Sequence, residues 1–204
     1  MAKTQAQKAA DFEALHKAPG VFVIPNPWDV GSARILAGLG FKALTTTSAG
    51  YARSIGFPDY NAGRENVMAH IRAIAPMIDV PLAAALEDGF GRKPEDCAET
   101  IRQGAEAGLV GGSIEDFTGD RSDPIHSIEV AADRVRAAAE QARKLPFKFM
   151  LCARAENYLN GRQDLGDTIR RLQAYQEAGA DVLFAPGLNT SDEMREVCRS
   201  IDRP

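Results

Sequence analysis

The side chains of this sequence that are suited to catalysis lie at the ends of short apolar runs. Two runs end in carboxylates and a third ends in a guanidinium: Glu87 with Asp88, Glu115 with Asp116, and Arg154. Mg²⁺ commonly binds one or two protein carboxylates together with water and substrate oxygens. An arginine binds a substrate carboxylate through two parallel N–H groups. These residue types therefore predict a site for a divalent cation and a small organic anion.

The segment 45–50, TTTSAG, adds a turn rich in hydroxyl groups. Such a turn, with closely spaced backbone N–H groups, can hold a carboxylate or a phosphoryl group. A cation, an arginine and an anion-binding turn together describe a site that binds a 2-oxo acid and stabilises its enolate. Because a single carboxylate is usually a solvated loop residue or a helix N-cap, this hypothesis requires several of these segments to meet in space.

The elements that would bring these segments together alternate along the chain. Three segments, 36–46, 105–116 and 176–187, read as a helix that ends near Ala-Gly and is followed at once by a short strand. Glycine just past a helix takes the left-handed conformation of a C-cap. We predict six strands, with helices between them, at 21–28, 42–49, 80–87, 110–116, 147–155 and 181–187. Such alternation is typical of a parallel sheet covered by helices.

Two architectures show this alternation, the doubly wound open sheet and the (βα)8 barrel. The first predicted strand is not followed by a Gly-x-Gly-x-x-Gly turn, and polar residues end most of the strands, which favours the barrel with its ring of active-site loops. We therefore predict an α/β fold of the (βα)8 TIM-barrel type. Because the chain stops at CRSIDRP, we expect one barrel domain over residues 1–204, truncated after about six βα units and lacking strands 7 and 8.

Composition narrows the class of partner. The net charge is −4, no basic stripe interleaved with aromatic residues is found, and no apolar run approaches the roughly 18 residues of a membrane span. The three cysteines share no metal-ligand spacing, and the first residues lack the apolar core of a secretory signal. We expect a cytoplasmic protein with a small-molecule partner, and neither a nucleic-acid nor a membrane partner.

Five motifs occur in order at the predicted strand ends: NPWD, TTTSAG followed by SIGFPD, LEDGFG, SIED and ARAEN. In this order they resemble the isocitrate lyase and phosphoenolpyruvate mutase superfamily, over roughly residues 20 to 200. The resemblance implies a (βα)8 barrel enzyme that breaks or rearranges a C–C or P–C bond beside the carbonyl of a 2-oxo acid. It also implies that Mg²⁺ holds an enolpyruvate-like intermediate, and that the protein is a homo-oligomer, since full-length relatives are tetramers.

The resemblance also assigns roles to individual residues. It implies that Thr46, Thr47 and Ser48 form the substrate-anion loop, that Asp59 contacts the reacting group or the metal shell, that Glu87 and Glu115 belong to the Mg²⁺ shell, and that Arg154 binds the substrate carboxylate. We count Asp59, Glu115 and Arg154 as the candidate catalytic residues. Trp28 of NPWD is a candidate for the pocket wall, with a place in the core as the alternative.

Two departures from the family pattern bear on the chemistry. The family's most direct metal ligand is an aspartate at the position of Ala85, so Mg²⁺ binding is expected to be weak. Asp88 is a candidate replacement ligand, although neighbouring strand residues point to opposite faces and Asp88 would need a local turn. The lyase branch carries a Lys-Arg-Cys-Gly-His loop after IED, whereas this chain has FTGDRSDPIH, which favours the phosphonomutase-like branch.

Two functional hypotheses follow from these observations. The first is a Mg²⁺-dependent lyase or phosphonomutase-like enzyme that acts on a small 2-oxo acid or phosphonate through an enolpyruvate intermediate. The alternative, motivated by Ala85 and the early stop, is a catalytically weakened or non-catalytic relative that acts as a ligand-binding or assembly protein.

Overall fold

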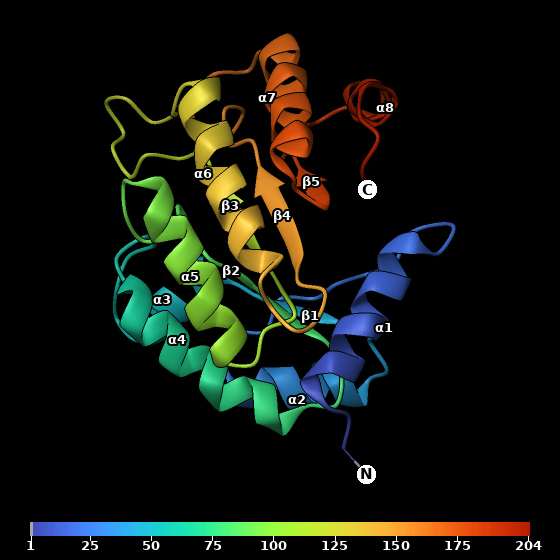
Figure 1. Ribbon diagram of the computed structural model, residues 1–204. Coiled ribbons are helices and arrows are strands. Elements are labelled where there is room, and N and C mark those ends of the chain that lie inside the picture. The colour runs from blue at the N-terminus through green and yellow to red at the C-terminus, as the bar shows by residue number, and fades with distance from the viewer. Residues whose placement is uncertain (1) are drawn as a thin grey trace.

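The computed structural model describes residues 2–204 and consists of parallel strands with helices packed around them (Figure 1). The helices are α1 (Gln5–Lys17), α2 (Val30–Gly38), α3 (Ser48–Ser54), α4 (Gly63–Ile74), the short 3-10 helix η1 (Ala75–Met77), α5 (Pro94–Glu106), α6 (Ile128–Ala142), α7 (Leu165–Ala178) and α8 (Ser191–Ser200). The strands are β1 (Leu44–Thr46), β2 (Leu82–Ala85), β3 (Gly111–Glu115), β4 (Met150–Arg154) and β5 (Val182–Phe184).

The five strands form one sheet in sequential order, β1-β2-β3-β4-β5, and every neighbouring pair is parallel. Each strand is followed by a helix, and α5, α6 and α7 lie side by side along one face of the sheet (Figure 1). Sequential parallel strands joined through helices are the arrangement of a barrel rather than of a doubly wound sheet, whose strand order reverses. The predicted α/β fold of barrel type is therefore confirmed.

The predicted strand at 21–28 is wrong, because this segment forms no strand of the sheet. It runs beside β1, where the carbonyl oxygens of Pro25 and Pro27 accept hydrogen bonds from the backbone N–H groups of Thr45 and Thr47, at 3.2 and 3.3 Å. Proline has no N–H to donate, so two alternate positions of the segment bond only through their carbonyls. At the opposite edge, the N–H of Leu183 in β5 donates to the carbonyl of Pro204 at 2.9 Å.

The strand register determines which side chains lie on the interior face of the sheet, the face opposite to α5, α6 and α7. Ala85 pairs with Ser113, and Glu115 pairs with Arg154, so these four side chains share one face. The opposite face carries apolar residues such as Leu82, Ile114 and Leu151, which pack against the helices in the main hydrophobic core. The side chains of Glu115 and Arg154 are thus separated from this core by the sheet itself.

Helix α1 packs against the interior face of the sheet near the amino ends of β3 and β4, away from the carboxyl ends that carry the polar residues. Its Phe12 is buried in a second, smaller cluster with Val110 and Met150. The side-chain amide of Gln5 donates to the carbonyls of Ala105 and Leu109, at 2.7 and 2.9 Å, beside the start of β3. Within residues 2–204, no helix is long and apolar enough to cross a membrane.

Candidate active site

A cavity of about 1420 Å³ opens on the interior side of the strands. Six of the predicted site residues line it: Thr46, Thr47, Ser48, Asp59, Glu115 and Arg154. They come from the end of β1 with the start of α3, from the loop between α3 and α4, and from the ends of β3 and β4. The parallel topology therefore brings together segments that lie up to about a hundred residues apart in the sequence.

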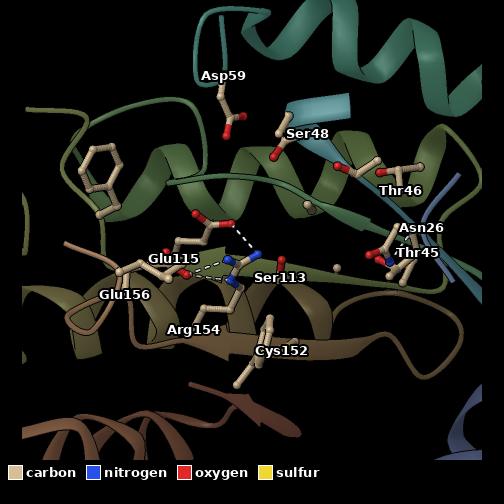
Figure 2. Close-up of a pocket in the computed structure, with 18 of the residues that line it drawn as sticks. Asn26, Thr45, Thr46, Ser48, Asp59, Ser113, Glu115, Cys152, Arg154 and Glu156 are labelled. Atoms are coloured by element: carbon tan, nitrogen blue, oxygen red, sulfur yellow. Dashed lines mark hydrogen bonds and ion pairs between the residues drawn. The ribbon is translucent and has the colours of Figure 1, made fainter. Parts of the chain in front are cut away.

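The guanidinium of Arg154 is held by two glutamates (Figure 2). Its Nη1 lies 2.9 Å from Oε1 of Glu115, and its Nη2 and Nε lie 2.7 and 2.8 Å from Oε1 of Glu156. The ring of Phe184 lies under it, with the guanidinium carbon 4.9 Å from the ring centroid. Burial acts to lower the pKa of Arg154, and the two carboxylates more than offset this, so its pKa lies above the usual value and the group stays charged.

The carboxyl groups of Glu115 and Glu156 lie on either side of the Arg154 guanidinium. Burial raises the pKa of Glu115 and of Glu156 above their usual values, while Arg154 acts to lower both. The negative charge of Asp59 adds to the upward shift at both glutamates. The guanidinium of Arg154 therefore lies between two carboxyl groups that gain a proton more readily than usual.

The turn after β1 has the expected place but a partly structural role. The hydroxyl of Thr47 caps helix α3 by accepting a hydrogen bond from the N–H of Gly50 at 3.1 Å. Thr46 is buried at the end of β1. The side chains of Ser48 and Asp59 lie near each other on one side of the cavity, with Arg154 and Glu115 on the other (Figure 2). A small anion between them would contact polar groups from separate segments of the chain.

Three predicted residues lie outside the lining of this cavity: Trp28, Glu87 and Asp88. Trp28 is half exposed. Glu87 follows β2 with a left-handed backbone, φ 51°, so the chain turns there, and its buried carboxylate is not part of the cavity lining. The local turn that Asp88 would need is present, but it directs Oδ1 of Asp88 to the N–H of Phe90, at 2.8 Å. Asp88 thus closes its own turn.

The methyl group of Ala85 lines the cavity where the family pattern has an aspartate. Both oxygens of Glu115 have partners, Oε1 with Arg154 and Oε2 with the hydroxyl of Tyr60. Glu87 keeps one buried oxygen, Oε1, without a partner, and it is not among the residues that line the cavity. Among residues 2–204, no group of three or more acidic, histidine or cysteine side chains is placed to hold a metal ion. The residues present do not fit a directly bound Mg²⁺.

The lining residues that were not among the predicted site residues include Tyr60, Ser113, Cys152 and Glu156, which lie near Glu115 and Arg154 in the sequence or in the structure. A strand alternates its side chains with a period of two, so Ser113 could have been found from Glu115, and Cys152 from Arg154. Glu156 stands in the ARAEN motif, two residues after Arg154. Tyr60 has no comparable signal, because its contact with Glu115 joins positions 55 residues apart.

Comparisons with known proteins agree with this geometry. The family model for phosphoenolpyruvate phosphomutase matches residues 12–204. An uncharacterized protein of Mycobacterium tuberculosis is 34% identical over 95% of this chain and 71% of its own length. The 2-methylisocitrate lyase of Escherichia coli is 30% identical over 81% of this chain, which spans 57% of that enzyme.

Solved structures give the same family. A lyase/mutase-type protein from Burkholderia cenocepacia superposes with a TM-score of 0.96 and 54% identity, over 98% of this chain and 72% of that one. Phosphonopyruvate hydrolase, solved with oxalate and Mg²⁺, superposes with a TM-score of 0.88 and 25% identity, over 97% of this chain and 70% of that one. The chain therefore belongs to the phosphoenolpyruvate phosphomutase family and is an enzyme of the isocitrate lyase and phosphoenolpyruvate mutase superfamily.

Proposed function

We propose that the protein is a lyase or phosphonomutase-like enzyme that acts on a small 2-oxo acid or phosphonate, at the C–C or P–C bond beside the carbonyl, through an enolate intermediate. One observation carries this proposal. The guanidinium of Arg154, the hydroxyl turn 46–48 and the carboxylate of Asp59 line one cavity from three different segments of the chain. A cation, an anion-binding turn and a group for proton transfer are what enolate chemistry requires.

Arg154 has the donors to bind a substrate carboxylate. Each Nη of a guanidinium carries two N–H groups. One contact of Nη1 goes to Glu115 and one of Nη2 goes to Glu156, which leaves an N–H on each for a ligand. Thr46, Thr47 and Ser48 would hold the second anionic group, and Asp59 would face the reacting carbon. Trp28 has no direct contact with a ligand in this scheme, because it lies outside the cavity lining.

The proposed scheme contains no step through a metal, although Mg²⁺ stays a prediction from the family resemblance. A bound Mg²⁺ would stabilise the negative charge of an enolate oxygen. Support for it comes from phosphonopyruvate hydrolase, which was solved with oxalate and Mg²⁺. Against it stand the methyl group of Ala85 and the occupied oxygens of Glu115.

The loop after β3 favours a mutase-like or hydrolase-like reaction over cleavage that uses a loop cysteine. Residues 117–126 contain no cysteine, and the loop is closed by an antiparallel bridge between Phe117 and Ile125. Cys152 lines the cavity from β4, but burial raises the pKa of its thiol to about 12, so it stays protonated near neutral pH. No thiolate is thereby available as an acid-base group.

A second candidate function is ligand binding without catalysis, and Ala85 is the observation that favours it. Assembly into a homo-oligomer remains a proposal for either function. Val21 and Val23, at the start of the segment beside β1, and Phe184 of β5 are exposed apolar side chains near the two edges of the sheet, where a second copy of the chain would cover them.

The test is a substrate screen over 2-oxo acids and phosphonates, with pyruvate formation or C–C cleavage as readout. We expect turnover with at least one small acid of these classes. Arg154→Gln should reduce kcat/KM by about 10-fold or more, because charge-assisted hydrogen bonds contribute about 1.5 to 3 kcal/mol. Arg34→Gln, an exposed arginine outside the cavity, is the control. Equal activity of the Arg154→Gln variant would refute the site assignment, and oxalate binding without turnover would favour the non-catalytic candidate.

A further inference from the structure

Tyr60 has an unusual backbone for its residue type. Its φ is 63°, in the left-handed region that a bulky residue rarely adopts unless its surroundings hold it there. Its N–H donates to Oδ1 of the neighbouring Asp59 at 3.2 Å, and its ring packs on Phe117 with the centroids 4.7 Å apart. This conformation places the phenol in the cavity, where it lies against Glu115.

The phenol hydroxyl donates to Oε2 of Glu115, whose other oxygen, Oε1, pairs with Nη1 of Arg154. The Glu115 side chain is 2% exposed, so water has little access to either oxygen. A buried carboxylate oxygen without a partner is costly. Tyr60 and Arg154 together satisfy this carboxylate from its two sides, and no cation is required for that purpose.

A separate observation concerns Ala85. Its methyl group faces the cavity beside Ser113, its partner in the strand register, so β2 contributes no carboxylate to the cavity lining next to Glu115. The absence of that ligand and the full pairing of Glu115 arise from different segments of the chain. Both remove a reason for a cation to bind there.

We propose that Tyr60 replaces a divalent cation as the partner of Glu115, so that this site binds planar oxyanions such as oxalate without a metal. The inference rests on the proposed function, because it assumes that the cavity receives a 2-oxo acid or its enolate. Tyr60 acts as a positioning residue: its hydroxyl fixes Glu115, Glu115 fixes one edge of the Arg154 guanidinium, and the remaining N–H groups of Arg154 bind the anion.

The first experiment is calorimetric titration of the full chain with oxalate, in metal-stripped buffer and in the same buffer with millimolar Mg²⁺. Because oxalate also binds Mg²⁺ in solution, the free oxalate concentration is fixed from a titration without protein. We expect the two dissociation constants to agree within about 2-fold. A requirement for Mg²⁺, seen as binding at least about 10-fold tighter with the metal, would overturn the inference.

Tyr60→Phe tests the role of the hydroxyl, since it keeps the ring and its packing on Phe117. Loss of a hydrogen bond to a charged group is expected to weaken metal-free oxalate binding by about 10-fold. Oε2 of Glu115 then becomes available, so added Mg²⁺ should restore part of the affinity. A merely structural role would weaken binding equally with and without Mg²⁺, and that result would refute the assignment.

Two further variants complete the comparison. Tyr51→Phe removes a hydroxyl that donates to the carbonyl of Asn66 at 2.9 Å, outside the cavity, and should leave both dissociation constants unchanged. Ala85→Asp together with Tyr60→Phe supplies a carboxylate and frees Glu115, and should make oxalate binding depend on Mg²⁺. If it does not, the cavity is no metal site in either form and the explanation through Glu115 is wrong.

The outcomes separate this inference from the proposed function. Oxalate binding by the wild-type protein only with Mg²⁺ refutes the inference and leaves the proposed function standing. Absence of oxalate binding in both buffers, with protein shown to be folded by circular dichroism, refutes both. Equal binding in both buffers, with loss in Tyr60→Phe and Mg²⁺-dependent recovery, supports both.

Discussion

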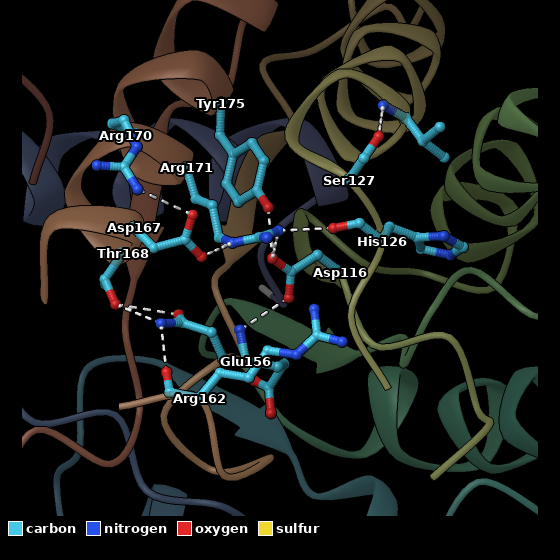
Figure 3. A network of polar contacts seen from close by, with 12 residues as sticks. Asp116, His126, Ser127, Glu156, Arg162, Asp167, Thr168, Arg170, Arg171 and Tyr175 are labelled. Carbon is cyan, nitrogen blue, oxygen red and sulfur yellow. Dashed lines mark hydrogen bonds and ion pairs between the residues drawn. The ribbon is translucent and has the colours of Figure 1, made fainter. Parts of the chain in front are cut away.

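Replacement of Asp116 by alanine should destabilise the protein strongly, because this carboxylate is the centre of a buried network (Figure 3). Asp116 follows β3 and accepts hydrogen bonds from Nη1 of Arg171 at 3.1 Å, the hydroxyl of Tyr175 at 2.5 Å and the N–H of Glu156 at 2.8 Å. The side chains of Arg171 and Asp116 are 6% and 1% exposed. The network thereby ties helix α7 to the segment that holds Arg154.

The magnitude follows from what the substitution leaves behind. Breaking a buried ion pair by removing one partner costs about 3 to 5 kcal/mol, since a charge stays buried without compensation. Arg171 keeps two partners, Oδ2 of Asp167 at 2.7 Å and the carbonyl of His126 at 2.8 Å, which argues for the lower part of this range. The hydroxyl of Tyr175 also loses its acceptor. We expect a loss of about 3 kcal/mol.

Urea unfolding followed by circular dichroism measures the loss in free energy of unfolding, and thermal unfolding measures the melting temperature. At about 2 to 4 °C per kcal/mol for a chain of this size, the melting temperature should fall by about 6 to 12 °C. Tyr175→Phe, which removes one hydrogen bond of the network, should cost about 1 kcal/mol. The control is Asp133→Ala, which breaks an exposed pair with Arg136 and should cost less than about 0.5 kcal/mol. A loss at Asp116 no larger than at Asp133 would refute the reasoning.

Three further predictions concern other parts of the molecule. Burial, followed by the charges of Asp59, Glu115 and Asp88, raises the pKa of Glu87 to about 8. The folded state therefore binds a proton that the unfolded state has lost, and stability should fall as the pH rises from about 5 to 8. The urea midpoint should fall less over this range in Glu87→Gln than in the wild-type protein. The same dependence of the midpoint on pH in both proteins would contradict this prediction. Gly111→Ala places a Cβ 2.7 Å from Phe12 and 2.9 Å from the carbonyl oxygen of Met150. Because α1 must shift to make room, we expect the free energy of unfolding to fall by about 1 to 3 kcal/mol. The control is Gly38→Ala, where the new Cβ meets no atom within 4 Å and no change is expected. Iodoacetamide should label the exposed Cys198 first, because Cys97 is buried and burial raises the pKa of its thiol to about 11. Mass spectrometry of the folded protein measures the two rates. Equally fast labelling of Cys97 would contradict this prediction.

Local signals in the sequence determined much of the fold. Ser127 caps α6 by accepting a hydrogen bond from the N–H of Val130, and Pro94 occupies the first turn of α5, both as expected from short-range sequence preferences. Gly179 ends α7 with φ 109°, as expected for a helix followed directly by a strand. These features depend on residues within a few positions of one another, so the sequence alone was sufficient to predict them.

The sequence also determined which strand ends would meet, because parallel strands in sequential order place all their carboxyl ends at one side. Thr46, Asp59, Glu115 and Arg154 do line one cavity. The segment 21–28 was predicted less well, since its apolar run VFVI resembles a strand while Pro25 and Pro27 remove the donors that a strand needs.

Only the tertiary structure decided how the carboxylates are used. The chain turns at Glu87 through a left-handed backbone, and this residue is not part of the cavity lining. The partner of Glu115 comes from Tyr60, 55 residues earlier in the chain. The acceptor of Arg171 lies equally far away, at Asp116. Such pairings depend on the packing of distant segments and on burial, which changes both the cost of an unpaired charge and its pKa. A local pattern specifies neither, so residue type and position along a strand predicted which side chains meet at the cavity but not which of its groups are free to react.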